Sequence, residues 1–140
     1  MYKIGFTGTR HGMTEPQKKA LKNILKHKEF EEFHHGDCLG SDQQAHDIAT
    51  QYKSIHNIKI IGHPPKYNKY RAYCQFDFAK KPADYLTRNR DIVNNTDFLI
   101  ATPDTIEKLH SGTWSTVRYA RTEKKRIYII HKSGRITIDG

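Results

Sequence analysis

Short apolar runs alternate with amphipathic stretches along the chain. The runs are rich in isoleucine, phenylalanine and tyrosine and are bounded by glycines or polar turn residues, a pattern that is typical of buried strands. The run at residues 98–101 is continuously apolar, as in a strand that is buried on both sheet faces. The pattern predicts strands at residues 2–7, 30–35, 58–61, 98–101 and 127–130, and an edge strand at residues 135–138.

Four helices are predicted between these strands. Thr14 with Gln17, and Ser41 with Gln44, have the spacing of a capping box, in which two side chains bond the free N–H groups of a helix start. Two further helices are predicted at residues 82–93 and 113–124. Because strands that alternate with helices require right-handed crossovers, we predict an α/β fold, a Rossmann-like parallel sheet of about five strands with helices on both faces.

Length and charge restrict the class of protein. A chain of 140 residues fits a single domain, residues 1–140. The formal net charge of +9 favours polyanionic partners or phosphorylated ligands, although it also serves solubility alone. No apolar run approaches the ~20 residues of a membrane span, and the N-terminus lacks the pattern of a secretory signal. We therefore expect a cytoplasmic protein with no membrane partner.

Three loops rich in glycine and hydroxyl residues lie between a predicted strand and a predicted helix. Small residues allow a ligand to approach the backbone, and the free N–H groups of a helix start bind phosphate. In parallel sheets such ligands lie beyond the carboxyl ends of the strands. The alternative is that the loops are tight turns and helix caps without a ligand. The residues that we expect to bind a ligand are Gly8, Thr9, Arg10, Gly36, Asp37, Ser41, Asp42, Arg88, Ser111, Gly112 and Thr113.

The order of these motifs resembles the SLOG superfamily over residues 4–130. This superfamily includes the lonely-guy cytokinin-activating phosphoribohydrolases, the Rossmann domain of the DNA-processing protein family, and small stand-alone prokaryotic or phage-type members. The motifs that carry the resemblance are Gly8-Thr9-Arg10, His35-Gly36-Asp37 with Gly40-Ser41-Asp42, Arg88-Asn89-Arg90 before the apolar run at residues 98–101, and Ser111-Gly112-Thr113.

The resemblance implies a nucleotide or nucleotide-derived ligand, and it matches Arg88 to the arginine that the phosphoribohydrolases use beside the glycosidic bond. The catalytic glutamate of those enzymes is replaced by Thr116, and their proline-glycine-glycine sequence is absent. A hydroxyl cannot replace a carboxylate in activating water. The catalytic candidates are therefore Arg88 with a carboxylate from another position, Asp37 or Asp42 being the nearest expected and Asp91 and Glu107 the others.

Two further features leave alternatives open. The segment 63–82 interleaves aromatic residues with lysines and arginines, which suits either a lid or subunit interface or a nucleic-acid surface. His34, His35 and His46 lie near Asp37 and Cys38, but no HxxxH or CxxC spacing supports a metal. We expect no metal and assign no cofactor.

Two classes of function remain. The first is binding of a nucleotide-derived small molecule, for sensing or sequestration, with a phosphoribohydrolase-like N-glycosidase as its catalytic alternative. The second is a module that binds nucleic acid weakly and without sequence specificity, through its positive charge. The resemblance also implies a homo-oligomer, a dimer or larger.

Overall fold

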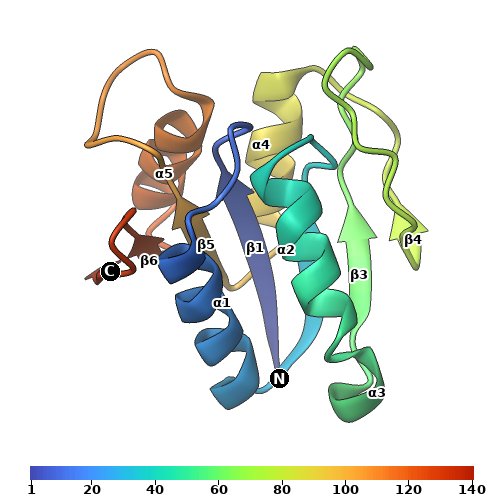
Figure 1. The fold of residues 1–140 in the computed structure, drawn as a ribbon. Coiled ribbons are helices and arrows are strands. Elements are labelled where there is room, and N and C mark those ends of the chain that lie inside the picture. The colour runs from blue at the N-terminus through green and yellow to red at the C-terminus, as the bar shows by residue number, and fades with distance from the viewer.

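Seven strands form one sheet in the order β4-β3-β2-β1-β5-β6-β7 in the computed structural model, which describes residues 1–140 (Figure 1). All neighbouring strands are parallel except β6 and β7, which are antiparallel. The strands are β1 (Tyr2–Gly8), β2 (Phe30–His35), β3 (Lys59–Gly62), β4 (Phe78–Ala79), β5 (Phe98–Thr102), β6 (Arg126–Ile130) and β7 (Ile136–Asp139).

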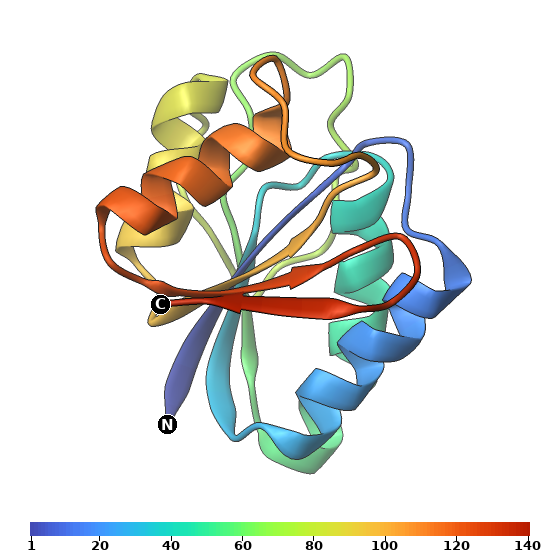
Figure 2. The same ribbon diagram turned by 90° about the vertical axis from the view of Figure 1, so that its left-hand side faces the viewer.

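Helices cover both faces of this sheet. Figure 2 shows α1 and α2 on one side of the strands and α4 and α5 on the other. None of the helices is long and apolar enough to cross a bilayer. The helices are α1 (Glu15–His27), α2 (Ser41–Thr50), α3 (Lys53–His56), α4 (Tyr85–Asn94) and α5 (Gly112–Thr122).

Each face of the sheet has its own apolar core. Phe6, Phe33 and Ile100 are buried beneath α1 and α2, whereas Leu99 and Ile127 are buried with Val117 of α5 on the opposite face. Full burial of one such side chain stabilises the fold by about 1.5–3 kcal/mol. All five residues of β5 are buried because helices cover this central strand on both sides.

The predicted Rossmann-like α/β fold with helices on both faces is confirmed, but the predicted strand number is too low, since the sheet has seven strands rather than about five. The missing strand is β4, which has only two residues, both exposed, so that no apolar run marks it. The helix α4 begins at Tyr85, after the N-cap Asp84, which is three residues later than the predicted start at residue 82.

The capping box at Thr14 and Gln17 is confirmed, but the one predicted at Ser41 and Gln44 is wrong. Gly40 is the N-cap of α2 and makes no side-chain cap. The Ser41 hydroxyl instead donates to the carbonyl of Thr9, and the Gln44 side chain accepts the N–H of Met13 at 2.7 Å. Both side chains therefore fasten the loop that follows β1.

Strand order reverses at β1, whose neighbours are β2 on one side and β5 on the other. The loops after these strands consequently diverge at their carboxyl ends and leave a crevice, which is the usual ligand position in a doubly wound sheet.

Candidate ligand-binding site

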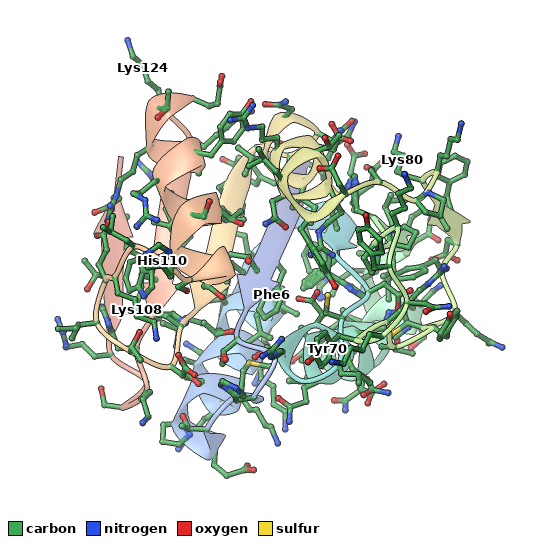
Figure 3. The ribbon with its side chains drawn as sticks, turned by 90° about the horizontal axis from the view of Figure 1, so that it is seen from above. Phe6, Tyr70, Lys80, Lys108, His110 and Lys124 are labelled. Carbon is green, nitrogen blue, oxygen red and sulfur yellow. The ribbon has the colours of Figure 1, made fainter.

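A cavity of about 420 Å³ opens at the carboxyl ends of β1, β2 and β5, and most of its lining residues are polar. Figure 3 views this edge from above, with Phe6 near the centre, Lys108 and His110 on the α5 side and Tyr70 on the opposite side. Nine of the eleven residues expected to bind a ligand line this cavity: Gly8, Thr9, Arg10, Gly36, Asp42, Arg88, Ser111, Gly112 and Thr113.

The other two expected residues, Asp37 and Ser41, are buried but do not line the cavity. Asp37 pairs with Arg71 at 2.9 Å and accepts the N–H of Cys74 at 2.9 Å. These bonds occupy its carboxylate and fix the segment around residue 71 to the end of β2. Asp37 is thus placed as a structural ion-pair partner, and Ser41 as a loop anchor.

The loops after β1 and β2 are joined backbone to backbone. The N–H of Ser41 donates to the carbonyl of Thr9 at 3.1 Å. Gly40 has a φ of 87°, and a Cβ at this position would lie 2.1 Å from the carbonyl oxygen of Arg10. Only glycine meets both conditions without strain, so this residue allows the two loops to form one wall of the cavity.

Arg88 is buried between α4 and the end of β2. Its Nη1 donates to the carbonyl oxygens of Gly36 and His63 and to Cys38 Sγ, and its Nε donates to Asn89 Oδ1 at 2.8 Å. The guanidinium therefore lines the cavity and also holds the ends of β2 and β3. Arg90, two residues later, is exposed and lies over the Tyr119 ring outside the cavity.

Asp42 places a buried carboxyl group on the same wall. Burial raises its pKa to about 6, although Arg88 and the N–H of Cys38 act in the opposite direction. The Cys38 N–H donates to Oδ2 at 3.2 Å. A carboxyl group with a pKa raised toward neutrality, inside a cleft, is typical of functional sites.

The opposite wall includes the start of α5. Ser111 caps this helix by accepting the N–H of Trp114 at 3.3 Å, while the N–H groups of Gly112 and Thr113 have no helical partner, as in every first turn. Lys108 and His110 lie beside them on the cavity wall. Free amides and a cation at a helix start form a favourable environment for an anion.

Ten cavity residues were not predicted from the sequence. His11 and Asp104 are the best defined of these, since His11 Nδ1 lies 2.8 Å from Asp104 Oδ2, which also accepts the Thr9 hydroxyl at 3.1 Å. The hydrogen bond from His11 lowers the pKa of Asp104. Both residues lie in the loops directly after β1 and β5, and this position is the signal that could have found them. The ten residues are Phe6, Thr7, His11, Cys38, Tyr85, Asn89, Ile92, Asp104, Lys108 and His110.

The aromatic segment at residues 63–82 packs beside the cavity. The N–H of Leu39 donates to the carbonyl of Tyr70, and the N–H of Ala72 donates to that of Asp37, both at 2.8 Å. The Arg10 guanidinium lies 4.3 Å from the centre of the Tyr70 ring. The segment is thus hydrogen-bonded to the loop after β2, and its Tyr70 holds the cavity residue Arg10.

His35, His46 and Cys74 bring three potential metal-ligand atoms within 4.8 Å of one another. However, His35 Nδ1 accepts the N–H of Asp37, so its proton lies on Nε2, which faces His46 Nδ1 at 2.9 Å. Burial and Asp37 raise the pKa of the Cys74 thiol to about 12. Because metal binding needs an unprotonated nitrogen and a thiolate, this geometry favours a hydrogen-bonded histidine pair.

Comparison with protein-family models and with curated protein sequences finds no match. Solved structures with the same fold include the molybdenum cofactor binding protein of the phototrophic bacterium Rippkaea orientalis, at 21% identity and a TM-score of 0.67, covering 91% of this chain and 75% of that protein. TM1055, known from its X-ray structure, has 17% identity and a TM-score of 0.59, covering 91% of this chain and 72% of that protein.

The DNA processing protein A (DprA) of Streptococcus pneumoniae has 20% identity and a TM-score of 0.62, and the match covers 91% of this chain but 49% of DprA. These three structures share one architecture. This chain has the fold of these three proteins. The fold expected from the order of the sequence motifs is therefore confirmed.

Thr116, the residue that the sequence resemblance matches to the glutamate of the phosphoribohydrolases, lies outside the cavity. Its hydroxyl donates to the carbonyl of Gly112 at 2.9 Å, and the residue lines a groove between α4 and α5. Only Asp42 and Asp104 bring carboxyl groups to the cavity wall. The catalytic candidates that remain beside the cavity are thus Arg88 and Asp42, but not Asp37.

Proposed function

We propose that the protein binds a phosphorylated nucleoside derivative in this cavity and acts in sensing or sequestration. The observation that carries the proposal is the convergence of three loops on one polar cavity of about 420 Å³ at the strand-order reversal, with the α5 amides, Lys108 and Arg10 on its walls. Helix-start amides and cations suit a phosphate group, and the remaining volume suits a small polar ligand.

The related structures support this class of ligand. One is described as a molybdenum cofactor binding protein and another as a DNA processing protein. The N-glycosidase alternative has less support, because the glutamate position carries Thr116 and faces away from the cavity. Without a positioned acid or base, the cleavage of a bound ligand is slow, so that the protein binds the ligand without cleaving it.

A thermal-shift panel of nucleoside mono-, di- and triphosphates tests the proposal. A ligand at about one hundred times its dissociation constant stabilises the folded state by about 2.7 kcal/mol, which corresponds to a rise in Tm of roughly 8 °C for a domain of this size. Inorganic pyrophosphate and the unphosphorylated nucleosides serve as controls. A panel in which no phosphorylated nucleoside raises Tm would contradict the proposal.

Gly112→Ala separates ligand binding from folding in this panel. A Cβ at Gly112 has no protein atom within 4 Å, and alanine is the better helix former, so the free protein should keep its Tm. The added methyl group should obstruct an anion at the α5 amides and reduce the nucleotide-induced shift by at least half. An unchanged shift would remove the α5 start from the binding site.

Weak binding of single-stranded nucleic acid is a second candidate function, supported by the segment 63–82. Tyr67, Tyr73 and Phe78 are exposed there, and Lys80 lies 5.4 Å from the Phe78 ring centre. Exposed aromatic rings and cations suit stacking on bases and contact with phosphates. Fluorescence anisotropy with a labelled oligonucleotide should show binding that falls steeply between 50 and 200 mM salt, whereas binding that survives 200 mM salt would show a specific nucleic-acid site.

A further inference from the structure

Asp42 has a buried carboxyl group with few donors from the protein. The N–H of Cys38 donates to its Oδ2 at 3.2 Å, and the backbone of Gly36 also favours its charged form. The residue is 6% exposed and lines the cavity. A buried carboxylate with few donors carries a desolvation cost that donor groups of a ligand would reduce.

The other carboxyl group on the cavity wall, that of Asp104, differs because two side chains hold it and it is more open to solvent. Asp104 Oδ2 accepts a hydrogen bond from Thr9 and lies 2.8 Å from His11 Nδ1. Its side chain is also more accessible, at 32%. Asp42 is therefore the acidic group of this cavity that is available for a ligand.

The charge of Asp42 limits what it can bind. A carboxylate is an acceptor only, and it repels the phosphate of a nucleotide. The phosphate therefore fits the wall with the α5 amides, Lys108 and Arg10, and the part of the ligand beside Asp42 must donate hydrogen bonds. Nucleotides offer two adjacent donors at the 2′,3′-diol of the ribose and, in guanine alone, at the N1–H and amino group of the base, so the ribose is the donor group that all ribonucleotides share.

We propose that Asp42 accepts hydrogen bonds from the ribose hydroxyls of the bound nucleotide and thereby selects ribonucleotides over 2′-deoxyribonucleotides. This inference rests on the proposed nucleotide-binding function. The position of Asp42 agrees with it, since the residue follows β2 beside the glycine loop of β1, where an acidic side chain meets a ribose in dinucleotide-binding folds. A polar site that loses a ligand hydroxyl discriminates strongly because its own group is left unpaired.

Isothermal titration with paired ligands tests the assignment. The probes are the four common ribonucleoside 5′-monophosphates, their 2′-deoxy counterparts and inorganic pyrophosphate. The wild-type protein should bind the ribonucleotide of a pair about 10- to 100-fold more tightly, the range for a charge-assisted hydrogen bond. Asp42→Asn should reduce the preference for the ribonucleotide over its 2′-deoxy counterpart to about threefold or less. The affinity for pyrophosphate should change little.

Asp47→Asn is the matched control, because Asp47 is exposed on the same helix and the charge change is identical. This variant should keep the wild-type preference for ribonucleotides over 2′-deoxyribonucleotides. Equal wild-type affinity for ribose and deoxyribose ligands, or selection that follows the base instead of the sugar, would overturn the role of Asp42 while leaving the proposed function in place. Failure of every nucleotide to bind would overturn the proposed function and this role with it.

Discussion

Arg88→Ala is expected to destabilise the folded protein by about 3–5 kcal/mol, because it leaves several buried acceptors without a donor. The guanidinium donates to the carbonyls of Gly36 and His63, which directly follow β2 and β3, and both residues are buried. The substitution also removes the cation that opposes the rise in the Asp42 pKa. The decrease in the free energy of unfolding should therefore exceed the contribution of one ordinary hydrogen bond.

Urea denaturation followed by circular dichroism measures this effect as a shift of the unfolding midpoint. Arg90→Ala is the control, because Arg90 is exposed on the same helix and its one aromatic contact, with Tyr119, lies at the surface. It should change the free energy of unfolding by less than about 1 kcal/mol. Similar losses in the two variants would show that Arg88 serves the ligand alone and not the fold.

This dual role of Arg88 changes how the sequence should be interpreted. The spacing of residues 88–90 indicates that one arginine can face the site while the other is solvated, and the structure agrees. It does not indicate that the inward arginine also bonds the ends of β2 and β3, because those partners lie 52 and 25 residues away. A loss of ligand binding in Arg88→Ala alone would thus not identify a binding residue.

The parts of the fold that the sequence predicts correctly depend on local patterns. The apolar runs of β1 and β5, and the capping box at Thr14 with Gln17, are signals contained within a few residues. The identical spacing at Ser41 and Gln44 misleads because Thr9 and Met13, more than 30 residues earlier, compete for the same side chains. A local motif predicts the local bond only when no distant partner offers a better one.

The candidate site shows the same limit. Glycines and helix starts identify three loops of the cavity, because those residue types report backbone conformation directly. Asp37 and Asp42 cannot be distinguished in this way, since both are acidic and both follow β2. Their difference comes from Arg71, which is 34 residues from Asp37 and neutralises it, whereas Asp42 has no such ion pair. The pairing of charges across the fold, and not the motif, decides which carboxylate is available.

Asp42→Asn is expected to stabilise the ligand-free protein, and the gain should depend on pH. The pKa of Asp42 is raised from 3.8 to about 6 in the folded state, so the folded protein binds this proton more tightly than the unfolded chain does. As pH rises from about 4 to about 7, the free energy of unfolding of the wild type therefore falls relative to that of the variant. The difference should be small at pH 4 and reach at most about 3 kcal/mol near pH 8.

Urea denaturation of the wild type, Asp42→Asn and Asp47→Asn between pH 4 and 8 measures this difference directly. Asp47 has the same charge but is exposed. The free energy of unfolding of Asp47→Asn should therefore change with pH in the same way as that of the wild type. An Asp42→Asn variant that is less stable than the wild type at pH 8, or a difference that is constant with pH, would mean that the carboxylate stabilises the fold. A gain in stability combined with loss of ribose selection would show a residue retained at a cost in stability, which is the behaviour of a functional group.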